Sequence, residues 1–313
     1  MGLLCTNSPP NRLRKNSNGR TVGALYERVF SGIHELRAVT DGAYSKSGVG
    51  VTVELPVNTF KRALKAGKPQ IGLWCSLSHH YAIEVVAGAG FDWLLLDTEH
   101  SPNELDMVLS QLQACGAYPV HPVVRVPWND MVTIKRFLDI GAQSLLIPYV
   151  QNEHEARNAV AYTRYPVEGL RGVAGTTRAS GFGRIKDYAK RAHEELCVLV
   201  QIETQTALDN LEKITAVEGI DGAFIGPGDL HASLGYAGET ANSNVKPLID
   251  DAIRRIRKAG RAPGILTLVE ADAKHWLEIG CQFVAVGADT NILARESENL
   301  AKRFKIAVLG QGT

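Results

Sequence analysis

The sequence predicts an α/β protein in which eight parallel strands close into a (β/α)8 barrel. Apolar runs of strand length alternate with amphipathic segments of helical length along most of the chain. The runs are continuously apolar, which is typical of strands buried on both faces of a parallel sheet. Four of them stop at a charged residue, and the carboxyl ends of barrel strands are where such folds place their active-site groups.

The elements follow one another from residue 58. A short helix capped by Asn58 or Thr59 and ended by Gly67 precedes the first strand. Strands are expected at residues 71–75, 93–97, 122–126, 144–148, 197–203, 222–226, 263–267 and 283–287. Helices are expected at residues 81–89, 104–115, 131–140, 154–165, 207–216, 245–259, 271–278 and 292–304. Eight strand–helix units are the number that this barrel requires.

Glycines support the predicted ends of several helices. A glycine just after a helix accepts the left-handed conformation that often ends it. The candidates are Gly90, Gly116, Gly141, Gly260 and Gly280.

One segment interrupts this alternation. Residues 166–183 are rich in glycine, contain Arg171 and Arg178, and precede the fifth strand. A loop of this length in a compact domain is usually functional or mobile. We therefore expect it to fold over the barrel mouth.

Composition limits the classes of function. The 313 residues are 45% hydrophobic and 21% charged, with a net charge of +1. This balance gives no electrostatic reason to expect nucleic acid or an anionic membrane as a partner. No apolar run approaches the ~20 residues of a membrane-spanning helix. The five cysteines are widely spaced and include no C-x-x-C pair, which favours free thiols in the reducing cytoplasm.

Residues 1–55 differ from the predicted barrel domain, residues 56–313. Residues 7–20 are polar and basic, and no acidic residue precedes Glu27. Such a segment buries too little apolar surface to fold, so disorder is expected. An organellar presequence and a functional tail are alternatives. We favour a dispensable extension, with the true start of the chain near Val53.

Two carboxylates predict a metal site. Glu203 and Asp229 end consecutive predicted strands, so they would be neighbours at the barrel mouth. Carboxylates, waters and substrate oxygens suit an octahedral Mg²⁺, Mn²⁺ or Co²⁺ ion. The alternative is that each carboxylate caps a helix, above all Asp229, because residues 226–230 open one.

Four further side chains are expected at the mouth. His100, oriented by Asp97 or another carboxylate, is a candidate general base. Arg125 ends a buried strand and would bind a carboxylate or enolate, unless it pairs with Asp97 or Glu203. Gln201 faces the same way as Glu203 by strand alternation. Glu99 is either a hydrogen-bond partner of the site or an exposed acid.

Other chemistries lack their residues. No lysine ends a predicted strand, so a Schiff-base aldolase has no nucleophile. Neither G-x-S-x-G, nor a P-loop, nor a strand-following G-x-G-x-x-G is present.

These motifs together resemble the class II pyruvate aldolases of the 4-hydroxy-2-oxoheptanedioate aldolase type. Relatives of that family include 2-dehydro-3-deoxyglucarate aldolase and the citrate lyase beta subunit. The resemblance covers residues 58–305. It is carried by FKRALKAGKPQIGLW (60–74), AGAGFDWLLLDTEH (87–100), PVVRVPWND (122–130), RYPVEGLRG (164–172), VLVQIE (198–203), GIDGAFIGPGDL (219–230), APGIL (262–266) and FVAVGAD (283–289).

The resemblance implies a modified (β/α)8 barrel of the phosphoenolpyruvate/pyruvate type. The implied reaction cleaves a 4-hydroxy-2-oxo acid, such as 4-hydroxy-2-oxoheptanedioate, to pyruvate and an aldehyde such as succinic semialdehyde. A sugar-acid aldolase that gives pyruvate and tartronate semialdehyde is the alternative. The implied assembly is a hexamer, a trimer of dimers, in which the last helix packs on a neighbouring subunit.

The resemblance also implies a role for each site residue. Glu203 and Asp229 would ligate the divalent metal, and Arg125 would stabilise the enolate. His100, with Asp97 as its orienting partner, would act on the proton of the aldol hydroxyl. The remaining implied contacts with the 2-oxo acid substrate come from Gln201, the amides of Gly228 and Asp229, Trp74 and Leu266.

Two rival functions fit the sequence less well. An acyl-CoA lyase on the same barrel would need a basic groove for the coenzyme, and no basic strip predicts one. A barrel kept only as a binding or assembly protein would be expected to have lost a site residue. Arg125, His100, Glu203 and Asp229 are all present.

Overall fold

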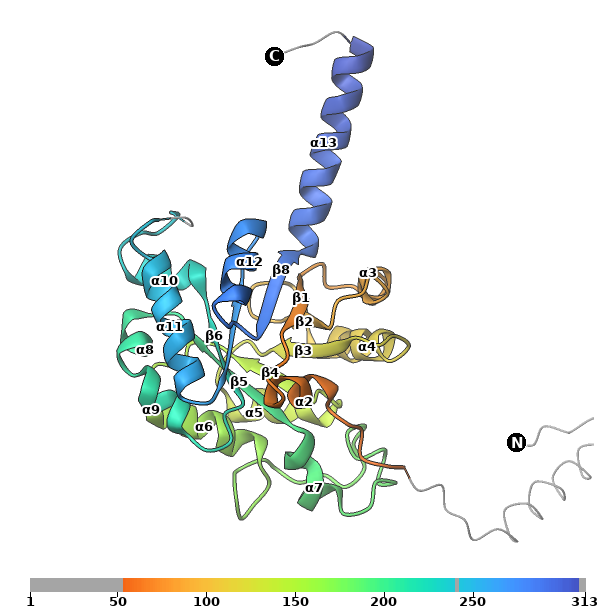
Figure 1. Cartoon of the computed structure of the whole chain (residues 1–313). Helices are drawn as coiled ribbons and strands as arrows, with labels where there is room; N and C mark the ends of the chain where they lie inside the picture. Colours follow the sequence, from red (N-terminus) through yellow and green to blue (C-terminus); the bar gives the residue numbers. More distant parts are fainter. Residues whose placement is uncertain (1–52, 240–241, 310–313) are drawn as a thin grey trace, which may run out of the picture. The chain divides into compact units, whose positions relative to one another are not determined.

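The computed structural model describes residues 53–239 and 242–309, and it confirms the barrel (Figure 1). Eight parallel strands pair in sequence order, and the last pairs with the first. Each predicted strand lies within one residue of an observed strand at both ends. The strands are β1 Gln70–Cys75, β2 Trp93–Asp97, β3 His121–Arg125, β4 Ser144–Ile147, β5 Cys197–Ile202, β6 Gly222–Ile225, β7 Ala262–Leu266 and β8 Phe283–Ala288.

Residues 1–52 lie outside the described part of the chain. The expected disorder of the N-terminal extension and the alternatives for its role therefore remain predictions.

The helices surround the barrel except for α2, which precedes β1, and α13, which extends away from it (Figure 1). They are α2 Thr59–Lys65, α3 His80–Ala87, α4 Leu105–Cys115, α5 Met131–Asp139, α6 Glu153–Thr163, α7 Tyr188–Glu195, α8 Gln205–Asp209, α9 Leu211–Ala216, α10 Pro227–Ser233, α11 Lys246–Lys258, α12 Glu270–Glu278 and α13 Asp289–Leu309.

Two helical predictions need correction. The helix expected at residues 207–216 is two helices, because Asn210 ends α8 and begins α9. The Asn210 amide donates outside this segment, to the Gln151 carbonyl at 3.1 Å. Helix α7 was not expected, since its sequence YAKRAHEE has no apolar stripe and buries only Ala192 and Glu195.

The predicted glycine C-caps are left-handed at four of five positions. Gly90, Gly141, Gly260 and Gly280 have φ values from +74° to +104°. Gly116 has φ −61°, which contradicts the prediction. The chain continues to turn there, as Gly116, Ala117 and Tyr118 each donate to the carbonyl three residues earlier.

The barrel interior is filled by alternate residues of every strand. In β2, Trp93 and Leu95 belong to the interior cluster, whereas Leu94 and Leu96 pack against the surrounding helices. Gly72 leaves room for the Trp93 indole, because a Cβ there would lie 2.2 Å from the ring. This alternation continues to the carboxyl ends of the strands and decides which residues face the mouth.

Helix α2 closes the amino end of the barrel. Phe60 inserts between the rings of Trp93, His121 and Phe283, with centroid distances of 5.7–5.9 Å. Asn58 caps the helix by accepting from the Lys61 amide at 2.8 Å. Its own amide group donates to the Ser144 hydroxyl at 2.9 Å and to the Glu195 carbonyl at 3.0 Å.

The loop expected over the mouth lies at the opposite end. Arg178 donates to the Ile140 carbonyl at 2.7 Å, and the Ala179 amide donates to the Asp139 carbonyl at 3.1 Å. Both carbonyls belong to the carboxyl end of α5, which lies at the amino end of the barrel. The predicted position was wrong because a segment that precedes a strand enters the barrel from that end.

Among the described residues, no helix combines the length and the apolar character needed to cross a membrane.

Replacing Asn58 with alanine should lower the free energy of unfolding by about 2 kcal/mol, since a cap and two buried donors are lost together. Urea unfolding measures this change. Asn152→Ala is the matched control, because Asn152 caps α6 through the Glu155 amide; it should lose only about 1 kcal/mol. Equal losses would contradict a role for Asn58 beyond capping.

Candidate active site

The inward positions at the carboxyl ends of the strands bring five predicted residues into one layer. Trp74, Asp97 and Arg125 come from β1, β2 and β3, and Gln201 and Glu203 come from β5 and the residue that follows it. All five are at most 6% exposed. A polar layer this deeply buried needs partners for each of its charges.

Arg125 and Asp97 form a bidentate ion pair in this layer. Arg125 Nε donates to Asp97 Oδ1 at 2.8 Å, and Nη2 donates to Oδ2 at 2.7 Å. The Trp74 indole also donates to Oδ2, at 3.1 Å, and its ring lies 4.6 Å below the guanidinium carbon. Burial favours the neutral acid, but the hydrogen bonds and charge of Arg125 outweigh it and lower the pKa of Asp97.

This pairing realises the alternative partner of Asp97, and the expected role of Asp97 in orienting His100 stays a prediction. The Asp97 carboxylate accepts from the backbone amide of His100 at 3.4 Å, and no hydrogen bond links it to the imidazole within the described residues. Asp97 therefore orients Arg125, the alternative that the sequence left open. The His100 side chain is exposed at the mouth.

Glu99 is a partner of Arg125 rather than an isolated surface acid. Its Oε2 lies 2.8 Å from Arg125 Nη1, with only 14% of the side chain exposed. Burial raises the pKa of Glu99 to about 7; the charge of Arg125 opposes this rise, and the charges of Asp97 and Asp229 add to it.

Glu203 is a buried carboxylate held by neutral donors. Its Oε1 accepts from the Tyr149 amide at 2.7 Å, and its Oε2 accepts from the Gln201 side chain. The pKa of Glu203 is raised to about 7, chiefly by burial and also by the charges of Glu99 and Asp229. The hydrogen bonds from Gln201 and Tyr149 oppose this rise. A Cβ at Gly226 would lie 2.5 Å from Glu203 Oε2, so a glycine is needed beside this carboxylate.

Asp229 lies near Glu203 but is exposed at the mouth. It occupies the first turn of α10, and Gly226, which makes no side-chain cap, begins that helix. Among the described residues no hydrogen bond or ion pair involves the Asp229 carboxylate, so the capping alternative finds no support.

The residues present fit a hard divalent cation. The charge of Asp229 raises the pKa of both Glu99 and Glu203, and a cation between these carboxylates would relieve that repulsion. Gln201 Oε1 is buried and has no hydrogen-bond partner among the described residues, which leaves an oxygen for a metal-bound water or ligand. The described residues hold no set of three histidine, cysteine or acidic ligands. The protein would therefore supply two carboxylates, and water and substrate oxygens would complete the coordination of the cation.

Two further predicted substrate contacts border a cavity that Arg125, Glu203 and Asp229 do not line. Gly228 and Leu266 line a cavity of about 540 Å³ bounded by α10, α11 and α12. His231, which is 4% exposed, also lines it. Trp74 lies beneath Arg125, as described above.

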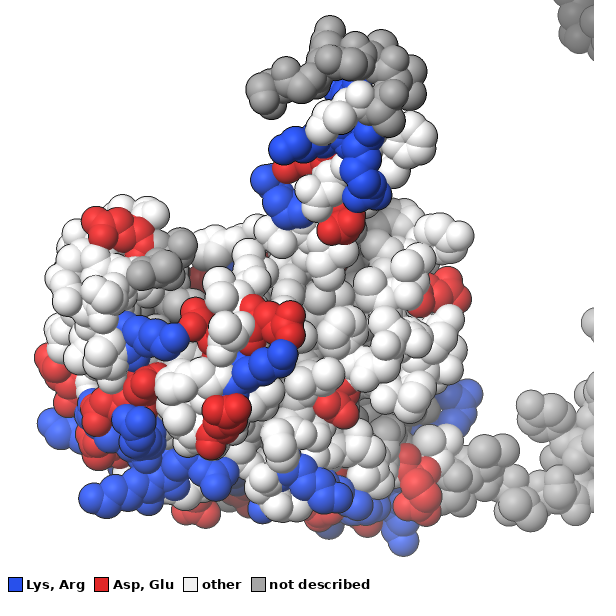
Figure 2. All heavy atoms as spheres, turned by 45° about the horizontal axis from the view of Figure 1, so that its top comes forward, with Lys and Arg blue, Asp and Glu red and all other residues white. Residues whose placement is uncertain are grey.

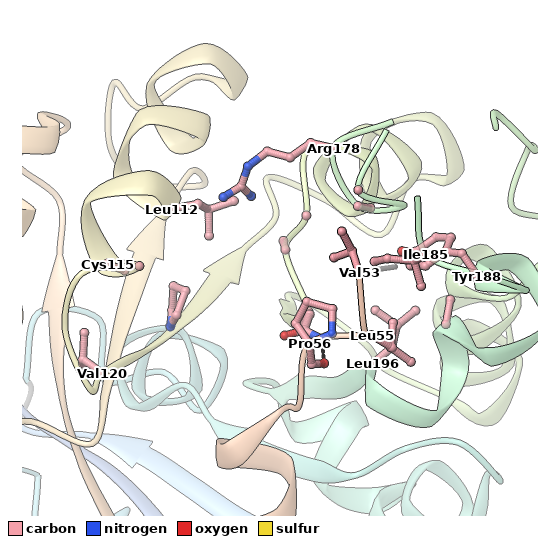
Figure 3. A pocket seen from close by; sticks show the side chains of 18 of the residues that line it. Val53, Leu55, Pro56, Leu112, Cys115, Val120, Arg178, Ile185, Tyr188 and Leu196 are labelled. Carbon is pink, nitrogen blue, oxygen red and sulfur yellow. Dashed lines mark hydrogen bonds between the residues drawn. The ribbon is translucent and has the colours of Figure 1, made fainter. Parts of the chain in front are cut away.

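A separate cavity of about 420 Å³ lies at the amino end of the barrel (Figure 3). Leu112, Cys115 and Val120 form one side, and Leu55 and Ile185 form the other. Its lining residues lie before or at the starts of β1, β3, β4 and β5, whereas the candidate active-site residues lie at the carboxyl ends of their strands. The cavity is therefore no part of the candidate active site.

Comparison with known proteins identifies the family to which the chain belongs. The model of the HpcH/HpaI aldolase/citrate lyase family matches residues 70–295. A curated 4-hydroxy-2-oxo-heptane-1,7-dioate aldolase from Salmonella dublin is 59% identical over 248 residues, which cover 79% of this chain and 94% of that protein. The chain belongs to the HpcH/HpaI aldolase/citrate lyase family.

Solved structures of this family share the fold. A family member from Burkholderia cenocepacia J2315 is 38% identical, with a TM-score of 0.77 over 80% of this chain and all of that one. The citrate lyase beta subunit of M. tuberculosis, solved with oxaloacetate and magnesium, is 16% identical. It has a TM-score of 0.50 over 72% of this chain and 93% of that one, which is a likeness of fold alone.

Two features of this HpcH/HpaI site escaped the sequence analysis. Tyr149 holds Glu203 through its backbone amide, and a backbone contact leaves no signature in residue type. The backbone of Tyr149 is left-handed, with φ +56°, which is uncommon for an aromatic residue. The Arg125–Asp97 pair was one of several alternatives, and only the register of β2 against β3, which aligns these two residues, decides it.

Glu203→Gln should stabilise the metal-free protein above pH 7 by about 3 kcal/mol at most. The pKa of Glu203 is raised from 4.5 to about 7 in the fold. The wild-type protein therefore loses stability as pH rises from about 4.5 to about 7, whereas the amide does not titrate. Urea unfolding in EDTA across this range measures the difference, which should vanish below pH 4.5.

The same variant tests the ligand assignment. Mg²⁺ should raise the melting temperature of the wild-type protein and leave that of Glu203→Gln nearly unchanged. Equal stabilisation of both proteins would show that Glu203 does not bind the metal.

Proposed function

We propose that the chain is a metal-dependent class II aldolase that cleaves 4-hydroxy-2-oxoheptanedioate to pyruvate and succinic semialdehyde. The single observation that carries the proposal is the buried layer of Arg125, Asp97 and Glu203 at the mouth of the barrel. The names of the curated relatives support the heptanedioate over the sugar-acid alternative.

Glu203 and Asp229 would hold the divalent metal, with Mg²⁺, Mn²⁺ and Co²⁺ as candidates. When bound, the cation supplies a Lewis acid that withdraws electrons from the 2-oxo acid. Glu203 must be ionised to bind, and its raised pKa predicts weaker metal binding below about pH 7.

Arg125 is placed to stabilise the developing enolate. Two of its five N–H groups donate to Asp97 and a third group faces Glu99, so further donors remain for a ligand oxygen. Asp97 fixes the plane of the guanidinium, so the donors are oriented before the substrate arrives. Such fixed donors are most effective where charge develops during the reaction.

His100 would move the proton. Its imidazole accepts the hydrogen of the C4 hydroxyl as the C4 carbonyl forms and the C3–C4 bond breaks. The electron pair of that bond becomes the enolate of pyruvate, whose oxygen faces Arg125. Protonation at C3 then gives pyruvate. Gln201 and the amides of Gly228 and Asp229 are the proposed contacts with the substrate carboxylate and oxygens.

The enzyme stripped with EDTA should release no pyruvate from 4-hydroxy-2-oxoheptanedioate, and added Mg²⁺, Mn²⁺ or Co²⁺ should restore release. A coupled lactate dehydrogenase assay measures pyruvate directly. No release with any of the three metals would contradict the proposed reaction.

Arg125→Lys provides the control. It keeps the positive charge but loses the bidentate pair with Asp97, so kcat should fall at least about 100-fold. Metal binding, measured by calorimetry with Mn²⁺, should persist. An unchanged kcat would remove Arg125 from the reaction.

The partner that we propose is a second copy of this chain. Helix α13 leaves the barrel after β8 (Figure 1), and large apolar side chains along residues 292–306 are exposed. Leu293 is 57% exposed and Phe304 is 64% exposed. The outer face near β1 and α3 is likewise uncovered, since Ile71, Tyr81 and Val85 are 38–69% exposed. Exchange of α13 between subunits would bury both surfaces, as in the expected hexamer, a trimer of dimers.

Charged residues of both signs are interspersed on the face that Figure 2 shows, including α13. Charged substitutions on the apolar side of α13 should therefore be soluble. The double variant Leu300→Asp, Phe304→Asp should reduce a hexamer to smaller species in light scattering after size exclusion. Lys302→Ala is the matched control and should keep the wild-type mass. An unchanged mass of the double variant would exclude α13 from the interface.

We also propose a cytoplasmic location. Cys75, Cys115, Cys197 and Cys281 are all free and buried, which a reducing compartment favours.

A further inference from the structure

Two aromatic side chains stand exposed beside the buried polar layer. Trp128 follows β3 and Tyr149 follows β4, and they are 53% and 39% exposed. Their rings are stacked, with centroids 5.5 Å apart and an angle of 28° between the planes. Large exposed aromatic pairs are uncommon on a protein surface without a binding role.

Both residues of the stacked pair are connected to the buried polar layer. Tyr149 donates its backbone amide to Glu203 Oε1 at 2.7 Å, so its Cα lies next to a proposed metal ligand. Trp128 lies three residues beyond Arg125, on the loop that follows β3. The backbone of Tyr149 is left-handed, with φ +56°, and such strain is concentrated at functional sites.

The order of the strands indicates which part of the substrate lies next to Trp128 and Tyr149. The proposed metal ligands follow β5 and β6, and the proposed base, His100, follows β2. The substrate must extend from the metal to the base, and the shorter way round the barrel passes β4 and β3. Pyruvate carbons bind at the metal end, so the carbon that carries the hydroxyl, with its substituent, lies toward β3 and β4.

We propose that Trp128 and Tyr149 form the wall that binds the substituent on C4, the arm that leaves with the aldehyde. This inference rests on the proposed aldolase function. The ring faces contact the methylene groups of the arm and make longer arms better substrates than short ones. The pair is a specificity-determining element, and it takes no part in moving protons or electrons.

The experiment compares two substrates that release the same pyruvate. The arm of 4-hydroxy-2-oxoheptanedioate has two methylenes and a carboxylate, and that of 4-hydroxy-2-oxopentanoate is a methyl group. Trp128→Ala and Tyr149→Ala should each lower the ratio of kcat/KM for the long substrate to that for the short one by about 2- to 10-fold. The loss should appear mainly in KM.

Conservative variants and a remote aromatic provide controls. Trp128→Phe and Tyr149→Phe keep an aromatic face and should retain most of the ratio. Phe182→Ala removes an aromatic that is 60% exposed in the loop before β5, at the opposite end of the barrel; it should leave the ratio unchanged. Equal losses for both substrates, or no loss for either, would overturn the proposal. So would a loss that appears only where light scattering shows a changed assembly.

A binding measurement separates this inference from the proposed reaction. Succinic semialdehyde, added to the Mg²⁺-loaded protein, should change the tryptophan fluorescence of the wild type, and Trp128→Phe should lose most of that change. A fluorescence change that survives in Trp128→Phe would overturn the proposed aromatic wall, whether or not the enzyme releases pyruvate. Absence of pyruvate release with an intact Trp128 response would instead overturn the reaction alone.

Discussion

The buried ion pair between Arg125 and Asp97 is the interaction on which the rest of the site depends. A guanidinium at the centre of a barrel is costly unless a carboxylate meets it with good geometry. Asp97 meets both donor nitrogens, and the Trp74 indole supports the pair from below. Arg125 is therefore charged, fixed in orientation and shielded from water before any substrate binds. Removing Asp97 would leave a buried charge without its partner, so the two residues act as one unit.

The two ends of the barrel have opposite tasks. At the amino end, Phe60, Trp93 and Phe283 fill the interior, and Asn58 ties α2 to the neighbouring strands. At the carboxyl end the same inward positions hold charges. The energy needed to bury a polar layer comes from the apolar layers beneath it, which is why catalytic groups can crowd at one end of this fold.

Most of the fold could be predicted from the sequence, because buried parallel strands give continuous apolar runs with clear ends. The membership of the site layer also followed from strand alternation, as for Gln201 and Glu203. Two features were not settled by the sequence: the end of the barrel at which one loop lies, and the side chain that pairs with Asp97. The loop that contains Arg178 lies at the end opposite to the predicted one, and Asp97 pairs with Arg125, while its predicted role toward His100 stays a prediction. The position of the loop follows from connectivity, because a segment that precedes a strand lies at the amino end of the barrel. The partner of Asp97 depends on the register of β2 against β3, which a single sequence does not contain.

The contact of Tyr149 with Glu203 separates two properties that usually change together. The carboxylate is held by a main-chain N–H group that nineteen of the twenty amino acids possess, so the identity of the residue at 149 is free of that duty. Substitutions there can remodel the surface above the site while the charge below keeps its place. A deletion in the same turn would move the amide itself. Variation among relatives at this position is therefore expected in residue type, with the length of the turn preserved.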